Sequence, residues 1–182
     1  MFFLRKSTLE RLPVAMTGVR MGERALQLGI EDPSLVGAIA AKVGLSGHAV
    51  IVVRDEREAA RARSAAEKAG ALVDVQVSPN ADLMFESASF DVIVLHAGNG
   101  QPGSIRDAAA VATLRDAYRV LRPGGRLVIV EGGATPGVLA FLRSRPNLPD
   151  SAAVVGSMSA AGFRAVRVLA EHEGYRFSEG LK

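Results

Sequence analysis

The chain has 182 residues and a mass of 19.1 kDa, the size of a single domain. With 48% hydrophobic and 23% charged residues it has a globular composition, and without cysteine it forms neither disulfides nor thiolate metal sites. The 22 basic and 19 acidic residues give a net charge of only +3 and are intermixed, and aromatic residues are few, so a nucleic-acid surface is not expected.

The first 20 residues are predicted to form a helical extension, followed by a single domain over residues 21–182. The apolar run at Met1–Leu4 is too short for a secretory signal and is followed at once by Arg5 and Lys6. No apolar run approaches the roughly 18 residues that cross a bilayer. We therefore expect a cytoplasmic protein that does not enter membranes.

Short apolar strands alternate with helices along the rest of the chain. Strands are predicted over residues 24–29, 48–53, 72–77, 90–95, 126–131, 163–170 and 174–179. Helices are predicted from Asp32-Pro33 to Gly44 and over 55–69 and 107–121, and the proline-rich segment 135–149 reads as a linker. This alternation predicts an α/β fold, doubly wound, with a mainly parallel sheet.

The two ends of the sheet are predicted to differ. The first five strands are nearly continuous in Val, Ile and Leu, which is typical of parallel strands covered by helices on both faces. The last two strands are separated by a short connection, and the first of them alternates apolar and polar residues. This pattern predicts an antiparallel hairpin at the C-terminal end of the chain.

One continuous run carries a family resemblance. The sequence LRDAYRVLRPGGRLVIVE at residues 114–131 resembles the helix, Pro-Gly-Gly turn and fifth strand of class I methyltransferases that use S-adenosylmethionine (SAM), of the type 11 kind. The segments SFDVIV at 89–94 and AGF at 161–163 are also similar to that family. The resemblance implies a seven-stranded Rossmann-like sheet with its last strand inserted antiparallel, SAM as cofactor, and methyl transfer to a small-molecule acceptor.

The loop after the first strand departs from the family pattern. Gly29 matches the first glycine, but Gln27 stands at the acid position, and Glu31 and Pro33 replace two further glycines. The resemblance implies that Gln27, Gly29 and Glu31 contact the cofactor. The other interpretation is that Asp32 and Pro33 simply begin a well-capped helix.

The next two strands also lack the family's acids. Val53 stands where the resemblance implies an acid for the ribose hydroxyls, and Asp55 lies two residues later. Asp55 either substitutes for that acid or caps the following helix. After the third strand Pro79 replaces an acid, and Asn80 is the candidate to offer its amide to adenine.

His96 ends the fourth strand, where the resemblance implies that the acceptor meets the methyl group. An imidazole there is a candidate catalytic base, and the alternative is a structural histidine. Gly98, Gly100 and Gly103 form the pattern G-x-G-x-x-G, a weak match to the dinucleotide-binding motif. The acids after the first strand would repel a pyrophosphate but suit the sulfonium of SAM, so SAM is favoured over NAD.

Three functions follow from these observations. The leading hypothesis is SAM-dependent methyl transfer to a small molecule. The second is a non-catalytic methyltransferase-like module for binding or assembly, and the third is an NAD-dependent oxidoreductase. Since little chain is left to cover a substrate, we expect a homodimer. No metal site is expected, because the three histidines lie on separate elements.

Overall fold

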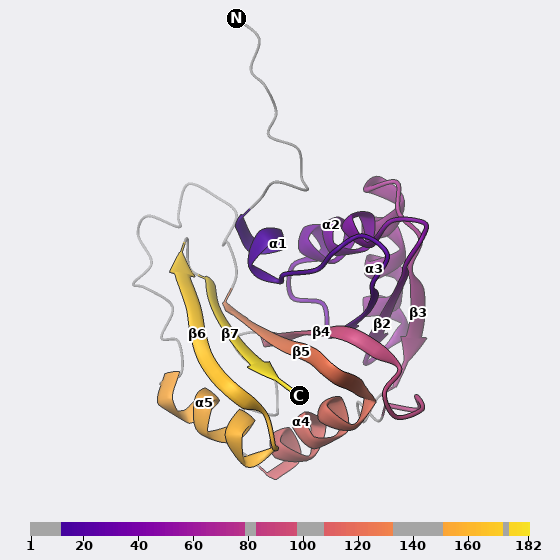
Figure 1. Cartoon of the computed structure of the whole chain (residues 1–182). Coiled ribbons are helices and arrows are strands. Elements are labelled where there is room, and N and C mark those ends of the chain that lie inside the picture. The colour runs from indigo at the N-terminus through magenta and orange to yellow at the C-terminus, as the bar shows by residue number, and fades with distance from the viewer. Residues whose placement is uncertain (1–11, 79–82, 98–107, 133–150, 173–174) are drawn as a thin grey trace, which may run out of the picture.

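The computed structural model describes residues 12–78, 83–97, 108–132, 151–172 and 175–182 (Figure 1). The helices in these ranges are α1 (Leu12–Met16), α2 (Pro33–Val43), α3 (Glu56–Lys68), α4 (Ala108–Val120) and α5 (Ser151–Ala160). The strands are β1 (Arg24–Leu28), β2 (His48–Val53), β3 (Asp74–Val77), β4 (Phe90–Ala97), β5 (Leu121–Gly132), β6 (Arg164–His172) and β7 (Tyr175–Leu181).

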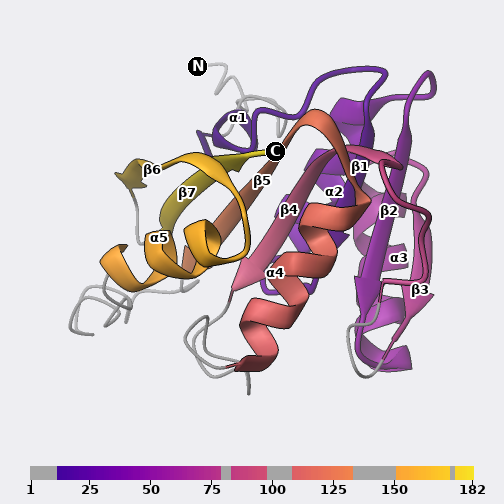
Figure 2. The same ribbon diagram turned by 60° about the horizontal axis from the view of Figure 1, so that its bottom comes forward.

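The strands form one sheet in the order β3-β2-β1-β4-β5-β7-β6. The pairs within β1 to β5 are parallel, and β7 runs antiparallel between β5 and β6. Helices α1, α2 and α3 cover one face and α4 and α5 the other (Figures 1 and 2). The predicted doubly wound fold, its seven strands and its inserted antiparallel strand are therefore confirmed.

Most predicted elements lie within a few residues of the observed ones, and two differences have clear causes. Helix α5 was not predicted, because its sequence is small and uncharged and buries only Val154 and Met158, one turn apart. Strand β5 begins at Leu121, earlier than the predicted start at residue 126, because Leu121 pairs with Phe90 before a register shift. The Pro-Gly-Gly turn is therefore an irregularity within the strand. The predicted linker 135–149 lies outside the described residues.

The helices that follow β1 and β2 begin at side-chain caps. Asp32 caps α2 by accepting a hydrogen bond from the Ser34 N–H at 2.9 Å, and Pro33 occupies the first helical position. Asp55 caps α3 by accepting from the Glu58 N–H at 2.8 Å. The capping interpretation of both aspartates is confirmed, and each cap places a carboxylate just beyond the carboxyl end of a central strand.

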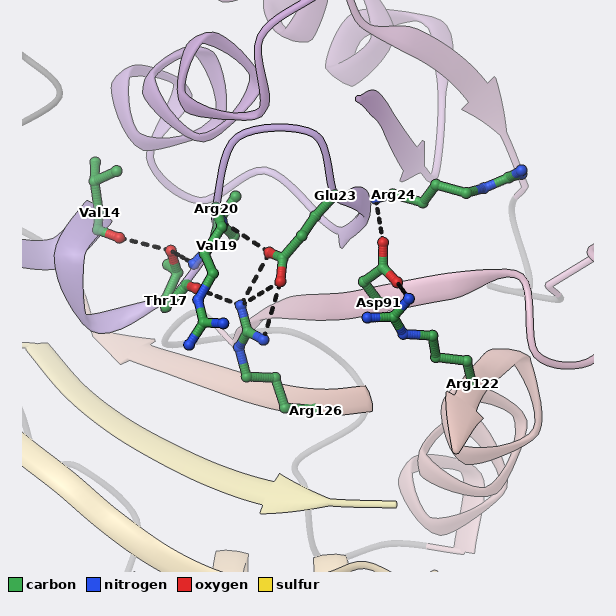
Figure 3. A network of polar contacts seen from close by, with 10 residues as sticks. Val14, Thr17, Val19, Arg20, Glu23, Arg24, Asp91, Arg122 and Arg126 are labelled. Carbon is green, nitrogen blue, oxygen red and sulfur yellow. Dashed lines mark hydrogen bonds and ion pairs between the residues drawn. The ribbon is translucent and has the colours of Figure 1, made fainter. Parts of the chain in front are cut away.

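Two carboxylates, one buried (Asp91) and one partly buried (Glu23), join the amino ends of the central strands (Figure 3). Asp91 of β4 accepts a hydrogen bond from the Arg24 N–H of β1 at 2.6 Å and pairs with Arg122 at 2.5 Å. Glu23, just before β1, pairs with Arg126 of β5 at 3.0 Å, and Arg126 also donates to the Gly18 carbonyl. These contacts fix β1, β4 and β5 at the edge opposite their carboxyl ends.

Gly37 lies where α2 packs on α3. A Cβ at this position would stand 2.4 Å from the Ala65 carbonyl oxygen, so the two helices would have to separate. We expect Gly37→Ala to lower the free energy of unfolding by about 1–3 kcal/mol, because overpacking outweighs the gain in helix propensity of about 1 kcal/mol.

The matched control is the same substitution in α5. A Cβ at Gly156 meets no described atom within 4 Å, so Gly156→Ala is expected to raise the free energy of unfolding by up to about 1 kcal/mol. Urea unfolding of the two variants and the parent protein measures both changes. Stabilisation by both substitutions would show that Gly37 is not required by the packing of α2 on α3.

Candidate functional site

The candidate site is the carboxyl edge of the sheet at β1 and β4. The strand order reverses between these two strands, and open α/β sheets bind ligands at such a reversal. Residues Gln27 and Leu28 of β1 pair with Val94 and Leu95 of β4, which brings Gly29 beside His96. Two segments that are far apart in the sequence thus form one edge.

Gly29 makes the tight turn that leaves β1. Its φ is +81°, a conformation that side chains with a Cβ rarely adopt. Its N–H donates to the Val52 carbonyl at 2.9 Å, and a Cβ would stand 3.3 Å from the His96 carbonyl oxygen. The turn therefore requires glycine both for its backbone conformation and for its contact with β4.

Gln27 and His96 form a buried hydrogen-bonded pair on the α2 face of the sheet. Gln27 is fully buried and His96 is 4% exposed. The Gln27 Nε2 donates to the Val36 carbonyl of α2 at 3.2 Å, and its Oε1 lies 3.2 Å from the His96 Nε2. Both polar atoms of Gln27 are therefore bonded inside the fold, and its predicted cofactor contact stays a prediction.

Burial determines the charge of His96. Removal of the ring from water lowers the pKa of His96 to about 4, and the nearby Asp32 carboxylate opposes this only in part. The imidazole is therefore neutral at physiological pH. In this state it offers one N–H donor and one basic nitrogen.

Asp32 connects the start of α2 to the opposite half of the sheet. Its Oδ1 accepts from Ser34, and its Oδ2 accepts from the Tyr175 hydroxyl of β7 at 2.8 Å. Burial raises the pKa of Asp32, but the hydrogen bonds from Ser34 and Tyr175 outweigh it, so the pKa lies below its usual value. Tyr175 was missed by sequence reasoning, since an aromatic residue at a strand start carries no signal for a partner 143 residues away.

Acidic side chains gather after β1 and β2. Asp55 and Glu31 are exposed there. Arg54 hydrogen-bonds the Glu58 carboxylate, and this bond, with the charges of Glu58, Glu31 and Asp55, raises the pKa of Arg54 above its usual value despite some burial. The predicted ribose contact of Asp55 and the cofactor contact of Glu31 stay predictions. Asn80 lies outside the described residues.

A second charged group lies on the opposite face of the same edge and was also missed. Glu131 at the end of β5 is 2% exposed and lies 3.7 Å from the Arg176 guanidinium of β7. Arg176 also donates to Glu171 of β6 at 2.6 Å. The sequence signal that could have indicated this group is Glu131 itself, an acid at the end of an apolar strand. Two carboxylates thus share one arginine across three strands.

The described residues give two further observations about this site and the surface. Among them, no group of three or more His, Asp or Glu side chains has the arrangement of a metal site. No helix within the described ranges is long and apolar enough to cross a membrane.

Comparisons with known sequences point to one family. A family model described as a methyltransferase domain matches residues 34–129. The ubiquinone/menaquinone biosynthesis C-methyltransferase of Escherichia fergusonii is 31% identical over 124 residues, which are 67% of this chain and 47% of that protein. The corresponding protein of Geotalea daltonii is 32% identical over 121 residues, 66% of this chain and 45% of that protein. The chain thus spans about half the length of these relatives.

Solved structures share the fold at low sequence identity. A SAM-dependent methyltransferase from Aquifex aeolicus has a TM-score of 0.67 and 19% identity, covering 92% of this chain and 86% of that one. The [4+2]-cyclase SpnF has a TM-score of 0.62 and 18% identity, covering 94% and 78%. Since a structure described as a cyclase has this fold, the fold does not fix the reaction.

Proposed function

Because this chain belongs to the methyltransferase-domain family, we propose that it transfers a methyl group from SAM to a small-molecule acceptor. The observation that carries the proposal is the Gly29 turn at the strand-order reversal, with β4 ending beside it in His96. This is the place where an open α/β sheet binds its ligand.

The charges at this edge suit SAM. The acids Glu31, Asp32 and Asp55 follow β1 and β2, and a field of this sign attracts the sulfonium and ammonium groups of SAM and repels a pyrophosphate. The open backbone of Gly29 allows close approach of a ligand. We therefore assign Gly29 and Glu31 to the methionine part of SAM, Asp55 to its ribose and Asn80 to its adenine.

His96 is the proposed residue on the acceptor side. When bound, SAM would supply an electrophilic methyl group and leave as S-adenosylhomocysteine, and the acceptor atom would gain that methyl and lose its proton to solvent. A neutral His96 accepts a hydrogen bond from the acceptor hydroxyl or amine through its basic ring nitrogen, which orients the nucleophile. Alignment and exclusion of water supply the rest of the catalysis.

The first experiment is calorimetric titration of the purified protein with SAM, S-adenosylhomocysteine and NAD. We expect either SAM species to bind with a Kd of about 1 μM, equivalent to about 8 kcal/mol, and NAD not to bind. Binding without methyl transfer to any compound of a broad acceptor panel would contradict catalysis. Absence of binding by both SAM species would contradict the cofactor assignment.

Gly29→Ala should weaken SAM binding about 10-fold, because the positive φ costs roughly 1–2 kcal/mol and the new Cβ presses on the His96 carbonyl. Gly124→Ala is the matched control, since Gly124 also has a positive φ, of +77°, but lies at the opposite edge of the sheet. Calorimetry should give the parent affinity for this control. Equal SAM affinities of the two variants would contradict the assignment of Gly29 to the cofactor site.

The second candidate function is a non-catalytic binding or assembly module. It is favoured by the absence of acids at Gln27, Val53 and Pro79, and by the engagement of both polar atoms of Gln27 inside the fold. The double substitution Glu31→Gly and Pro33→Gly separates the alternatives. A large gain in SAM affinity would indicate a degraded methyltransferase pocket, and no gain would indicate a site rebuilt for another ligand.

A homodimer in the cytoplasm completes the proposal. In this proposal a second copy of the chain closes the site over the acceptor. Light scattering of the purified protein should give twice the mass of 19.1 kDa. A monomeric mass across the working concentration range would contradict the dimer.

A further inference from the structure

The hydrogen-bond directions in the Gln27 and His96 pair follow from one backbone carbonyl. A carbonyl oxygen only accepts hydrogen bonds, so the Gln27 atom 3.2 Å from the Val36 oxygen must be the amide nitrogen. The Gln27 amide oxygen therefore lies 3.2 Å from the His96 Nε2. Since this oxygen only accepts hydrogen bonds, Nε2 must carry a proton and donate it to the oxygen. In a neutral ring the other nitrogen, Nδ1, is then unprotonated.

We propose that Gln27 is a positioning residue that fixes His96 in the neutral form with the proton on Nε2, leaving Nδ1 as the basic nitrogen at the end of β4. The amide itself is held by the first turn of α2, so the chain Val36–Gln27–His96 links α2, β1 and β4. The role of Nδ1 toward an acceptor rests on the proposed function, whereas the position of the proton does not.

The residue type at position 27 determines whether this pair is neutral. A carboxylate at position 27 would accept the same Nε2 hydrogen bond but would place a negative charge against the ring, which favours the imidazolium. Two negative charges would then face His96: that carboxylate and Asp32 at the start of α2. Tyr175 of β7 contacts Asp32 by a hydrogen bond from its hydroxyl. Glutamine instead provides an acceptor without charge, so the ring keeps a free base at Nδ1.

The burial of the pair makes its geometry selective. Gln27 is fully buried and His96 almost so, and water is therefore not at hand to replace the amide as partner of Nε2. Loss of the amide would leave Nε2–H and the Val36 carbonyl without this link. The ring would then exchange between its two neutral forms or turn about its side-chain torsions.

Nitrogen-15 NMR of the uniformly labelled parent protein tests the proton position directly. Between about pH 5.5 and 8 we expect the His96 signals to show a protonated Nε2 and an unprotonated Nδ1, without titration. The exposed His48 provides a histidine reference in the same sample. A protonated Nδ1, or averaged nitrogen shifts, would overturn the proposal.

Two substitutions test the role of the glutamine. Gln27→Leu should give averaged His96 nitrogen shifts, and Gln27→Glu should make His96 titrate at a higher pH than in the parent. Gln76→Leu, at a half-buried strand position in β3, is the matched control and should leave His96 unchanged. A fixed Nε2 proton in a folded Gln27→Leu protein would overturn the proposal, and the parent spectrum decides it if that variant does not fold.

Kinetics separate this proposal from the proposed function. If methyl transfer is observed, Gln27→Leu should lower kcat about 10- to 100-fold and leave the KM for SAM within about 2-fold. Unchanged kcat with averaged nitrogen shifts would contradict a catalytic use of Nδ1. If the parent does not bind SAM, the proposed function fails, while the NMR spectrum still decides the proton position.

Discussion

Asp91→Ala is expected to lower the free energy of unfolding by about 2–4 kcal/mol and the Tm by roughly 5–15 °C. The substitution removes the acceptor of the Arg24 N–H, which hydrogen-bonds the carboxylate at 2.6 Å, and the ion pair with Arg122. The Arg122 side chain is 58% exposed and regains water, so most of the loss comes from the backbone donor at the start of β1.

Two companion substitutions identify the cause of this loss. Asp91→Asn keeps an oxygen for the Arg24 N–H but removes the charge, so it should lose less than Asp91→Ala. Asp74→Ala, at an exposed position in β3, should change the free energy of unfolding by no more than about 0.5 kcal/mol. Thermal and urea unfolding of the three variants test this order. Equal losses from Asp91→Asn and Asp91→Ala would mean that the stabilisation comes from the charge of Asp91 and not from the backbone hydrogen bond.

The parent protein should lose up to about 3 kcal/mol of stability between roughly pH 6.5 and pH 4 because of His96. Burial lowers the pKa of His96 to about 4 in the folded protein, whereas an unfolded histidine titrates near 6.5. The unfolded chain therefore binds the proton first as the pH falls. The contribution is fully present above the unfolded pKa and is lost progressively down to the folded pKa.

Among the residues that the structure describes, two acids with lowered pKa values contribute at lower pH and do not obscure this window. Burial raises the pKa of Asp32 and of Glu58, but hydrogen bonds outweigh it in both, so both pKa values lie below their usual values. Their contributions are present above about pH 4 and are lost as the pH falls further. The slope between about pH 6.5 and 5 is therefore the signature of His96.

The measurement is urea unfolding at a series of pH values. His96→Gln should flatten the pH dependence between about pH 6.5 and 5, while His48→Gln, at an exposed strand start, should retain the slope. If His96→Gln keeps the full slope, the buried imidazole is not its source.

The pH behaviour of His96 also bears on catalysis. A ring with a pKa of about 4 is not protonated at neutral pH, and under the proposed function it would accept a hydrogen bond and align an acceptor atom. Under the proposed function, the acceptor best suited to such a residue is one whose reacting atom is already a good nucleophile. The uncharged amide of Gln27 and the buried ring of His96 thus form one arrangement in this chain.

Local sequence patterns determined the fold class of this protein. The apolar runs, the caps at Asp32 and Asp55 and the Pro-Gly-Gly turn act within a few residues along the chain, so they could be interpreted without the structure. The same patterns carried the family resemblance. They failed at α5, where the residues are small and uncharged and the helix is held mainly by packing on β6 and α4.

The tertiary structure decided which side chains of the candidate site meet. Gln27 reaches His96 across 69 residues, Asp32 reaches Tyr175 across 143, and Glu131 reaches Arg176 across 45. Those pairs depend on strand order and on the insertion of β7 beside β5, which no local pattern specifies at the level of individual atoms. Residue type identified Gln27 and His96 as candidates but not Tyr175 or Arg176, and only the packing of distant strands set the partners and burial of these side chains.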